Sequence, residues 1–320
     1  MIWVTWRQHR AQILVTAGFL ALLGLLLLGS AVEAGRYAAE HAPPGCPGPD
    51  VACGELEVAL GRRYGAVYTI FGWMPLVAPA LIGAFWGAPL LGREYERGTH
   101  RLAWTQSVSV RRWLLVKLSV LGATVTAGGL LLSLMVSLWR PVFRKGADST
   151  FGNIGVFNMV GVQPGVWWLY AFMLGVAAGA LFRRTLPAMA LVVAGVTVTM
   201  FTLFQLSDHY AEPVRAELSG DVLLADPDAR LVGAAWVEPS GREVTEPSVG
   251  GCPHRADMGR SDRNARAWEA CLFGKGYRHA VYYHPPSKFW RFQWTEAGIL
   301  TLASAALAGL AVRRTLRRPG

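Results

Sequence analysis

Long runs of uncharged, mostly apolar residues recur along the chain, and short segments between them carry the charges. A helix needs roughly 20 such residues to cross the hydrocarbon core of a bilayer. The runs predict six membrane spans: 13–32, one within 64–92, 118–139, 166–182, 185–207 and about 294–312. The predicted fold class is therefore an all-α polytopic membrane protein with six transmembrane helices.

Two of these runs are longer than a straight span requires. The second contains three prolines, Pro75, Pro79 and Pro89, so we expect it to tilt or bend at one of them. The uncharged stretch 149–182 is too long for one helix. We therefore place a loop there, through Asn153, Asn158 and Gly165, and begin the fourth span at Val166.

Composition supports a membrane protein over a soluble enzyme. The chain is 52% hydrophobic and only 16% charged, with a mean hydropathy of +0.31, whereas soluble proteins average about 25% charged residues. The net charge of +10 could indicate nucleic-acid binding. The basic residues, however, flank the apolar runs, as membrane insertion requires. We therefore expect no nucleic-acid partner.

The distribution of Lys and Arg also predicts the orientation. With the N-terminus inside, the inner segments hold 14 basic residues and two acidic ones, Glu94 and Glu96. This bias matches the rule that cytoplasmic loops are positive. We predict a multi-pass membrane protein with both termini cytoplasmic. Lys117, at the end of the third span, is expected to extend its ammonium group toward the interface.

All four cysteines fall in segments that this topology places outside, where disulfides persist. Three pairings are possible. The local pairs, Cys46 with Cys53 and Cys252 with Cys271, are the favoured ones, and four free thiols are the alternative.

The outer segment 207–293 is charged and rich in Pro and Gly, with strand-like pieces at 231–237 and 279–283. We predict a small disulfide-tied extracellular domain between the fifth and sixth helices. Its Cys252, His254, His279 and His284 match no standard zinc spacing, so no metal site is predicted.

The segment 1–12 resembles a helix lying on the inner membrane surface. Trp3 and Trp6 are at helical spacing, and Arg7 and Arg10 lie elsewhere on the turn. The alternative is an aromatic, basic flank of the first span. A cleaved signal peptide is disfavoured, because its apolar region is about 7–15 residues long and this run is longer.

Aromatic residues also precede the sixth span, at Phe289, Trp290, Phe292 and Trp294, with Glu296 just beyond them. We interpret this cluster as an interfacial belt at the outer face. A shallow re-entrant element or lateral gate for an amphiphilic substrate is the alternative.

Segment 93–112, between the second and third spans, contains the only acidic residues on the predicted inner side. A short helix here could offer carboxylates and guanidinium groups to a cytoplasmic partner, with Trp104 and Trp113 at the interface. An ordinary basic loop is the alternative.

Two small-residue motifs, Gly83-x-x-x-Gly87 and Gly175-x-x-x-Gly179, favour close helix packing within the chain or across a dimer.

The segment between the second and third spans, together with two others, resembles a known family. The motifs are Glu94-x-x-x-Gly98-Thr99, residues 106–109 (Gln-Ser-Val-Ser), Arg111-Arg112-Trp113 and Lys117. Together they resemble the first cytoplasmic loop of ABC-2 type transporter permeases. Residues 3–10 and 289–296 resemble an actinobacterial branch of that family, which implies the plasma membrane of a bacterium. The layout agrees: an N-terminal helix, six spans and a large outer loop before the last.

The resemblance implies that the N-terminal helix and first cytoplasmic loop contact a separate ATP-binding subunit. It assigns a coupling role to residues of that loop: Glu94, Gly98, Thr99 and Arg101, with Arg111 and Arg112 beside them. The chain has no Gly-x-x-x-x-Gly-Lys-Ser/Thr motif. ATP and Mg²⁺ would therefore be bound by the partner, and this chain would carry no cofactor and no catalytic residue.

The expected function is that of the permease subunit of an ABC exporter, forming a homodimer or a heterodimer with a paralogue. Its path would suit a hydrophobic or amphiphilic substrate, because apolar and aromatic residues would line it. A proton-coupled carrier is disfavoured, because the predicted spans lack charged relays apart from Glu296 and Lys117 near their ends. Membrane lipid is a further expected partner. The alternatives are a non-catalytic sensor or anchor presenting the outer domain, or an intramembrane enzyme. His-Glu-x-x-His and Gly-x-Ser-x-Gly are both absent.

The expected domain organisation has four parts. They are an interfacial helix at 1–12, helices 1–5 with the coupling loop 93–112 within 13–206, an extracellular domain at 207–293, and helix 6 with a basic tail at 294–320.

Overall fold

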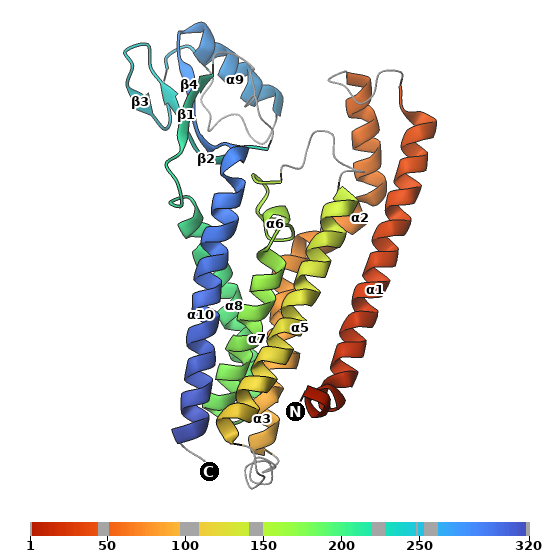
Figure 1. Cartoon of the computed structure of the whole chain (residues 1–320). Coiled ribbons are helices and arrows are strands. Elements are labelled where there is room, and N and C mark those ends of the chain that lie inside the picture. Colours follow the sequence, from red (N-terminus) through yellow and green to blue (C-terminus); the bar gives the residue numbers. More distant parts are fainter. Residues whose placement is uncertain are drawn as a thin grey trace. The chain divides into compact units, whose positions relative to one another are not determined.

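A computed structural model describes residues 2–43, 51–96, 109–140, 150–218, 228–247, 249–252 and 262–317. These residues divide into two compact units. The first comes from Met1–Ala147, Ile154–Ser207 and Trp290–Gly320, and the second from Asp148–Asn153 and Asp208–Phe289. Element labels follow Figure 1.

The first unit is helical (Figure 1). Its elements are α1 (Ile2–His41), α2 (Val51–Ile82), the π-helix η1 (Gly83–Gly87), α3 (Ala88–Glu96), α5 (Val110–Trp139), α6 (Ile154–Phe157), α7 (Gln163–Phe182), α8 (Thr185–Ser207) and α10 (Phe289–Arg317).

Six helical stretches in the described residues are long and apolar enough to span a membrane, and they confirm the six predicted spans. They are Trp6–His41, Gly72–Glu96, Val110–Trp139, Gln163–Phe182, Thr185–Ser207 and Pro286–Arg317. Apolar side chains dominate each stretch, and the regular backbone satisfies the peptide hydrogen bonds that a lipid environment leaves without water.

Helix α7 is the centre of the first unit and packs against α5, η1, α3, α8 and α2. A helix that is apolar all round, as this one is, must be buried on most sides. Its Trp167, Tyr170 and Ala171 form a core cluster with Val192 and Val196 of α8. By contrast, α1 leaves most of its leucines exposed, as expected for a helix facing lipid.

The two glycine motifs pack against each other within the chain. A Cβ added at Gly175 would overlap the carbonyl oxygen of Gly83, and one at Gly179 would lie 2.6 Å from the carbonyl oxygen of Ala88. Only glycine lets the backbones of η1–α3 and α7 approach this closely. The intramolecular interpretation of these motifs is therefore confirmed.

The second span contains an irregularity at η1, two residues before Pro89. Pro75 and Pro79 sit inside α2, and the helix type changes at Gly83–Gly87 before α3 begins. A π-helix widens the turn, and here it occurs where η1 packs closely on α7.

The fourth span begins earlier than predicted, at Gln163, so Gly165 lies inside α7 and not in a loop. A Cβ at Gly165 would lie 2.8 Å from Leu130 Cγ of α5, which shows why a glycine fits there. The preceding turn instead uses Gly161, whose φ of 65° favours glycine.

Residues 2–12 are helical and continue without interruption into the first span, as one helix to His41. The helix predicted at the N-terminus is thus present as the beginning of α1, and its position at a membrane surface remains a proposal.

The second unit contains an antiparallel sheet, so the prediction of an all-α protein is wrong for this part of the chain. The strand order is β1-β4-β2-β3, with β1 at Val214–Leu218, β2 at Arg230–Val237, β3 at Glu243–Val244 and β4 at Arg278–His284. Both strand-like pieces of the sequence, 231–237 and 279–283, are confirmed as β2 and β4. Their β-branched and aromatic residues suit a pleated surface.

Helix α9 (Asp262–Gly274) packs its Trp268 and Leu272 against Trp236 of β2. The rings of Trp236 and Trp268 meet edge to face, with centroids 5.3 Å apart. A disulfide joins Cys252 to Cys271 of α9, which confirms one of the two favoured pairs. The other pair is untested, because Cys46 and the side chain of Cys53 lie outside the described residues.

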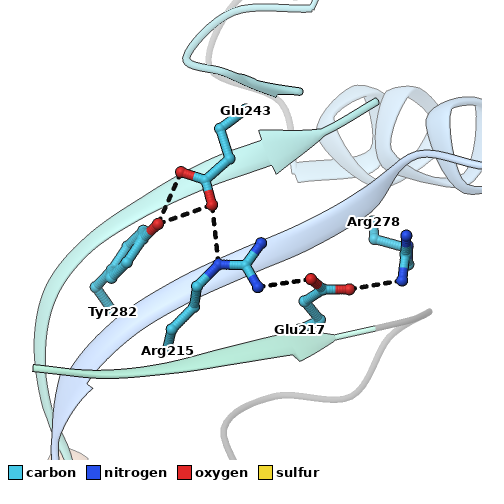
Figure 2. A network of polar contacts seen from close by, with 5 residues as sticks. All are labelled: Arg215, Glu217, Glu243, Arg278 and Tyr282. Atoms are coloured by element: carbon cyan, nitrogen blue, oxygen red, sulfur yellow. Dashed lines mark hydrogen bonds and ion pairs between the residues drawn. The ribbon is translucent and has the colours of Figure 1, made fainter. Parts of the chain in front are cut away.

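Figure 2 shows a charged network carried by β1, β3 and β4. Arg215 donates to Glu243 (2.9 Å) and Glu217 (2.6 Å), Arg278 donates to Glu217 (2.6 Å), and the Tyr282 hydroxyl donates to Glu243 (2.7 Å). These hydrogen bonds hold the pKa of Glu243 below its ordinary value. The hydrogen bond to Glu243 also raises the pKa of Tyr282 above its ordinary value. Because charges of both signs pair, the network connects three strands without a net charge.

Candidate functional site

The ends of helices α3 and α5 flank the predicted coupling segment, and an ion pair connects them. Lys117 Nζ of α5 lies 2.9 Å from Glu94 Oε1 of α3 and 4.1 Å from the centroid of the Trp113 ring. Lys117 is only 3% exposed. Lys117 thus reaches toward the end of α3 and the first turn of α5, where its charge is neutralised inside the bundle. Its position relative to a membrane interface stays a prediction.

The last turn of α3 is also attached to the junction between α7 and α8. Glu96 accepts hydrogen bonds from the backbone nitrogen and the hydroxyl of Thr185, both at 2.9 Å, at the first residue of α8. A carboxylate at a helix N-terminus satisfies free N–H groups and complements the helix dipole. The guanidinium of Arg183 lies 5.0 Å from the ring centroid of Tyr95. Three neighbouring side chains of α3, those of residues 94 to 96, thus contact two other parts of the bundle.

Helix α5 begins immediately after the segment, with Ser109 as its N-cap. The Ser109 hydroxyl accepts from the backbone nitrogen of Arg112 (3.4 Å). Arg111 and Arg112 are exposed in this first turn. The predicted coupling residues Gly98, Thr99 and Arg101 lie outside the described residues.

The first turns of α1 present exposed aromatic and basic side chains. Trp3 and Trp6 are 67% and 51% exposed, and the guanidinium of Arg7 lies 5.3 Å from the ring centroid of Trp3. Arg10 is exposed as well. These four residues are therefore available to a membrane surface or a partner protein, as an interfacial helix would require.

A polar cavity of about 370 Å³ lies between α1, α3 and α5 and includes the ion pair. Its lining includes Gln8, His9, Gln12, Arg93, Glu94 and Lys117. His9 Nδ1 lies 2.6 Å from Gln12 Oε1, and Gln12 Nε2 donates to the carbonyl oxygen of Phe85 (2.9 Å). Sequence reasoning missed this cavity, because hydropathy does not show which helices face one another.

The predicted aromatic belt at the start of α10 divides into two sets. Trp290 and Trp294 are exposed and stack with centroids 6.3 Å apart, as a belt at an interface requires. Phe292 and Glu296 are instead buried in the bundle. Phe289, assigned to the second unit, meets Phe151 edge to face at 6.1 Å.

Gln293, which the sequence pattern did not single out, connects α10 to the turn before α7. It is fully buried, accepts from the backbone nitrogen of Val162 (3.0 Å) and donates to the carbonyl oxygen of Phe157 (3.1 Å). Backbone groups in a turn need partners when buried. The available signal was its position between Phe292 and Trp294 at the start of an apolar run, since a buried polar side chain is expected to be hydrogen-bonded.

In the described part of the chain, no three His, Cys, Asp or Glu side chains gather as a metal site would require. The site that the structure brings together consists of polar contacts at both flanks of segment 97–108, made by Glu94, Glu96 and Ser109.

The six apolar helices define a multi-span membrane protein, and comparison with protein families gives its class. Residues 17–206, more than half of the chain, match the family model described as ABC-2 membrane transporter related. The chain therefore belongs to this family. Family membership supports a permease-type subunit of an ABC transporter, generally non-catalytic and associated with an ATP-binding subunit.

Searches of curated proteins and of solved structures each found no match. The resemblance to an ABC-2 permease is thus supported by the family model, and the narrower likeness to an actinobacterial branch remains a prediction.

Proposed function

We propose that this chain is the transmembrane permease subunit of an ATP-driven ABC-2 type exporter. It couples to a separate cytoplasmic ATPase subunit, which binds ATP and Mg²⁺, and it pairs with a second permease copy or a paralogue. The six helices provide the path for a hydrophobic or amphiphilic substrate. The proposal places both termini in the cytoplasm of a bacterium and the second unit outside the plasma membrane.

The observation that carries this proposal is the anchoring of both flanks of segment 97–108. At the first flank, Glu94 binds Lys117 of α5 and Glu96 binds Thr185 of α8. At the second flank, Ser109 caps α5. A force applied to this segment by a partner would be passed to α5, α7 and α8 together, since packed helices transmit displacement.

This geometry separates two roles among the residues that flank the coupling segment, including Glu96, which was not among the predicted coupling residues. Glu94 and Glu96 act as positioning residues, because their carboxylates bind other helices of the chain. Arg111 and Arg112 are exposed and suit contact with acidic groups of the ATPase subunit. In the proposal, Gly98, Thr99 and Arg101 complete the contact surface, together with Trp3, Trp6, Arg7 and Arg10 of α1.

The test is purification of the tagged full chain from native membranes in mild detergent, with mass spectrometry of bound proteins and an ATPase assay. We expect a stoichiometric P-loop ATPase and measurable ATP hydrolysis. The double variant Arg111→Ala/Arg112→Ala should lose most of the bound ATPase. The matched control, Arg313→Ala/Arg314→Ala, removes an exposed arginine pair from the end of α10 and should retain it.

Two results would contradict the proposal. A protein that purifies without any ATPase in several detergents would favour a membrane sensor or anchor that presents the second unit. Equal loss of ATPase in both double variants would show that the α5 arginines act only through general charge.

A further inference from the structure

A second cavity, apolar and larger than the polar one, lies along α1 and α2. Its volume is about 510 Å³, and its lining includes Phe19, Trp73, Val77, Leu81, Trp86 and Trp168. Ligand pockets in proteins usually measure about 300–1,000 Å³. Trp73, Val77 and Leu81 are also among the exposed apolar residues of α2, so the groove opens toward the hydrocarbon that surrounds the bundle.

The apolar groove and the polar cavity share helix α1, and η1 contacts α1 beside both of them. Gln12 of the polar cavity and Thr16 of the groove are one helical turn apart on α1, a rise of about 6 Å. Gln12 binds the carbonyl oxygen of Phe85, and the indole of Trp86 donates to the hydroxyl of Thr16 (3.2 Å). Both contacts fall on the π-helix η1, and such irregular turns frequently occur at functional sites.

The polar cavity has a net positive charge and a free acceptor. Lys117 and Glu94 neutralise each other, and Arg93 adds one positive charge. The Gln12 amide donates to Phe85, so its oxygen must accept from His9 Nδ1. Neutral His9 therefore offers Nε2 as an acceptor, and this buried nitrogen has no partner in the described part of the chain.

From this juxtaposition we propose that α1, α2 and η1 bind one molecule of an anionic phospholipid whose head group carries a hydroxyl. One acyl chain occupies the apolar groove. The phosphate lies near Arg93 and Lys117, and the head-group hydroxyl donates to His9 Nε2. Basic pockets between transmembrane helices on the cytoplasmic side are known to bind anionic head groups. An ammonium head group fits less well, because the cavity is already positive.

Binding is tested on the purified full chain in detergent, without an ATPase subunit. The probe is phosphatidylglycerol with a photoreactive diazirine in one acyl chain, and cross-linked peptides are mapped by mass spectrometry. We expect cross-links on α1 around Thr16 and on α2 around Val77. Ala78→Trp and Val77→Trp each fill the groove and should reduce them about fivefold or more, whereas Val198→Trp, on the exposed face of α8, should not.

Competition between unlabelled lipids tests the head group. Phosphatidylglycerol should compete better than phosphatidylmethanol, which is anionic without a hydroxyl, and phosphatidylcholine should compete least. Arg93→Gln should weaken both anionic lipids about fivefold, and the control Arg314→Gln should weaken neither. We expect phosphatidylglycerol to compete about threefold to tenfold better than phosphatidylmethanol. His9→Phe should remove this advantage and change nothing else in the competition.

The proposal would be overturned by cross-links spread over all exposed helix faces and insensitive to both groove-filling variants. Equal competition by phosphatidylcholine, or capture of a labelled fatty acid in preference to phosphatidylglycerol, would also overturn it. This proposal rests on the proposed function at one point: the proposed topology determines in which leaflet of the membrane the lipid lies. Failure to find an ATPase would contradict that function and leave this binding result unaffected.

Discussion

Lys117 and Glu94 form an ion pair with a nitrogen–oxygen distance of 2.9 Å, and the lysine is almost completely buried. The pair is asymmetric, because the Glu94 side chain keeps 23% of its exposure while that of Lys117 keeps 4%. The lysine therefore depends on the carboxylate and on the ring of Trp113 for stabilisation of its charge. The ion pair therefore connects the end of α3 to the first turns of α5.

The first prediction concerns this pair. Glu94→Gln leaves a buried ammonium without its counter-charge and should destabilise the protein by about 1–3 kcal/mol. Lys117→Met removes the charge itself, so the double variant should be more stable than the Glu94→Gln variant. The measurement is the thermal midpoint of the four proteins in detergent, compared as a double-mutant cycle. Additive effects of the two substitutions would show that the pair does not act as a unit.

The second prediction concerns the crossing of η1–α3 and α7. Gly175→Ala puts a methyl group against the Gly83 carbonyl, where the backbones cannot separate without losing packing. We expect a loss of about 1–3 kcal/mol, measured as a lower thermal midpoint. Gly309→Ala of α10, where an added Cβ meets nothing within 4 Å, is the control. It should be neutral or stabilise the helix by up to about 1 kcal/mol. Equal midpoints for the two variants would contradict the close approach.

The number and position of the spans were predictable from sequence, because hydropathy reports the environment of each residue along the chain. The close packing of the glycine motifs and the pairing of Cys252 with Cys271 were also accessible, since both depend on local patterns. What hydropathy cannot give is which helices face one another. The partner of Lys117 is 23 residues away, and the backbone groups bound by Gln293 are more than 130 away.

The same limit applies to the predicted site. The sequence does not show that Lys117, at the end of an apolar run, is buried and paired, because its acid lies on another helix. The small sheet of the second unit was indicated by its strand-like pieces. Its strand order was not, because β4 pairs with both β1 and β2 across long stretches of chain.

The third prediction concerns topology. In a Cys46→Ser/Cys53→Ser background, mild reduction followed by a membrane-impermeant thiol reagent should label Cys252 and Cys271 in intact cells. The reason is that the disulfide ties α9 within the second unit, which the proposed function places outside. Labelling without reduction should be weak, because the disulfide occupies both thiols. Labelling that requires permeabilised cells would reverse the proposed orientation.

The fourth prediction concerns the pH dependence of the second unit. His284 of β4 is buried, and its Nε2 lies 3.3 Å from the carbonyl oxygen of Asp208. Burial, the largest cause, and the nearby charges of Lys288 and Arg230 lower the pKa of His284 below 6.5, while Asp208 acts in the opposite direction.

A histidine with a lowered folded-state pKa binds its proton more readily in the unfolded chain, so folding is favoured at higher pH. Its stabilising contribution is complete well above pH 6.5 and is lost as the pH falls through 6.5 toward the folded-state pKa. Limited proteolysis of the full chain at pH 7.5 and 5.5 should therefore show faster cleavage within Asp208–Phe289 at the lower pH. His284→Gln removes the titrating group and should make the two rates more nearly equal.

The charged network of Figure 2 supplies an internal contrast. Its Glu243, whose pKa is lowered from 4.5 by Tyr282 and Arg215, loses its contribution only below that pH. If the pH effect between 7.5 and 5.5 were unchanged in His284→Gln, a group other than His284 would have to carry it.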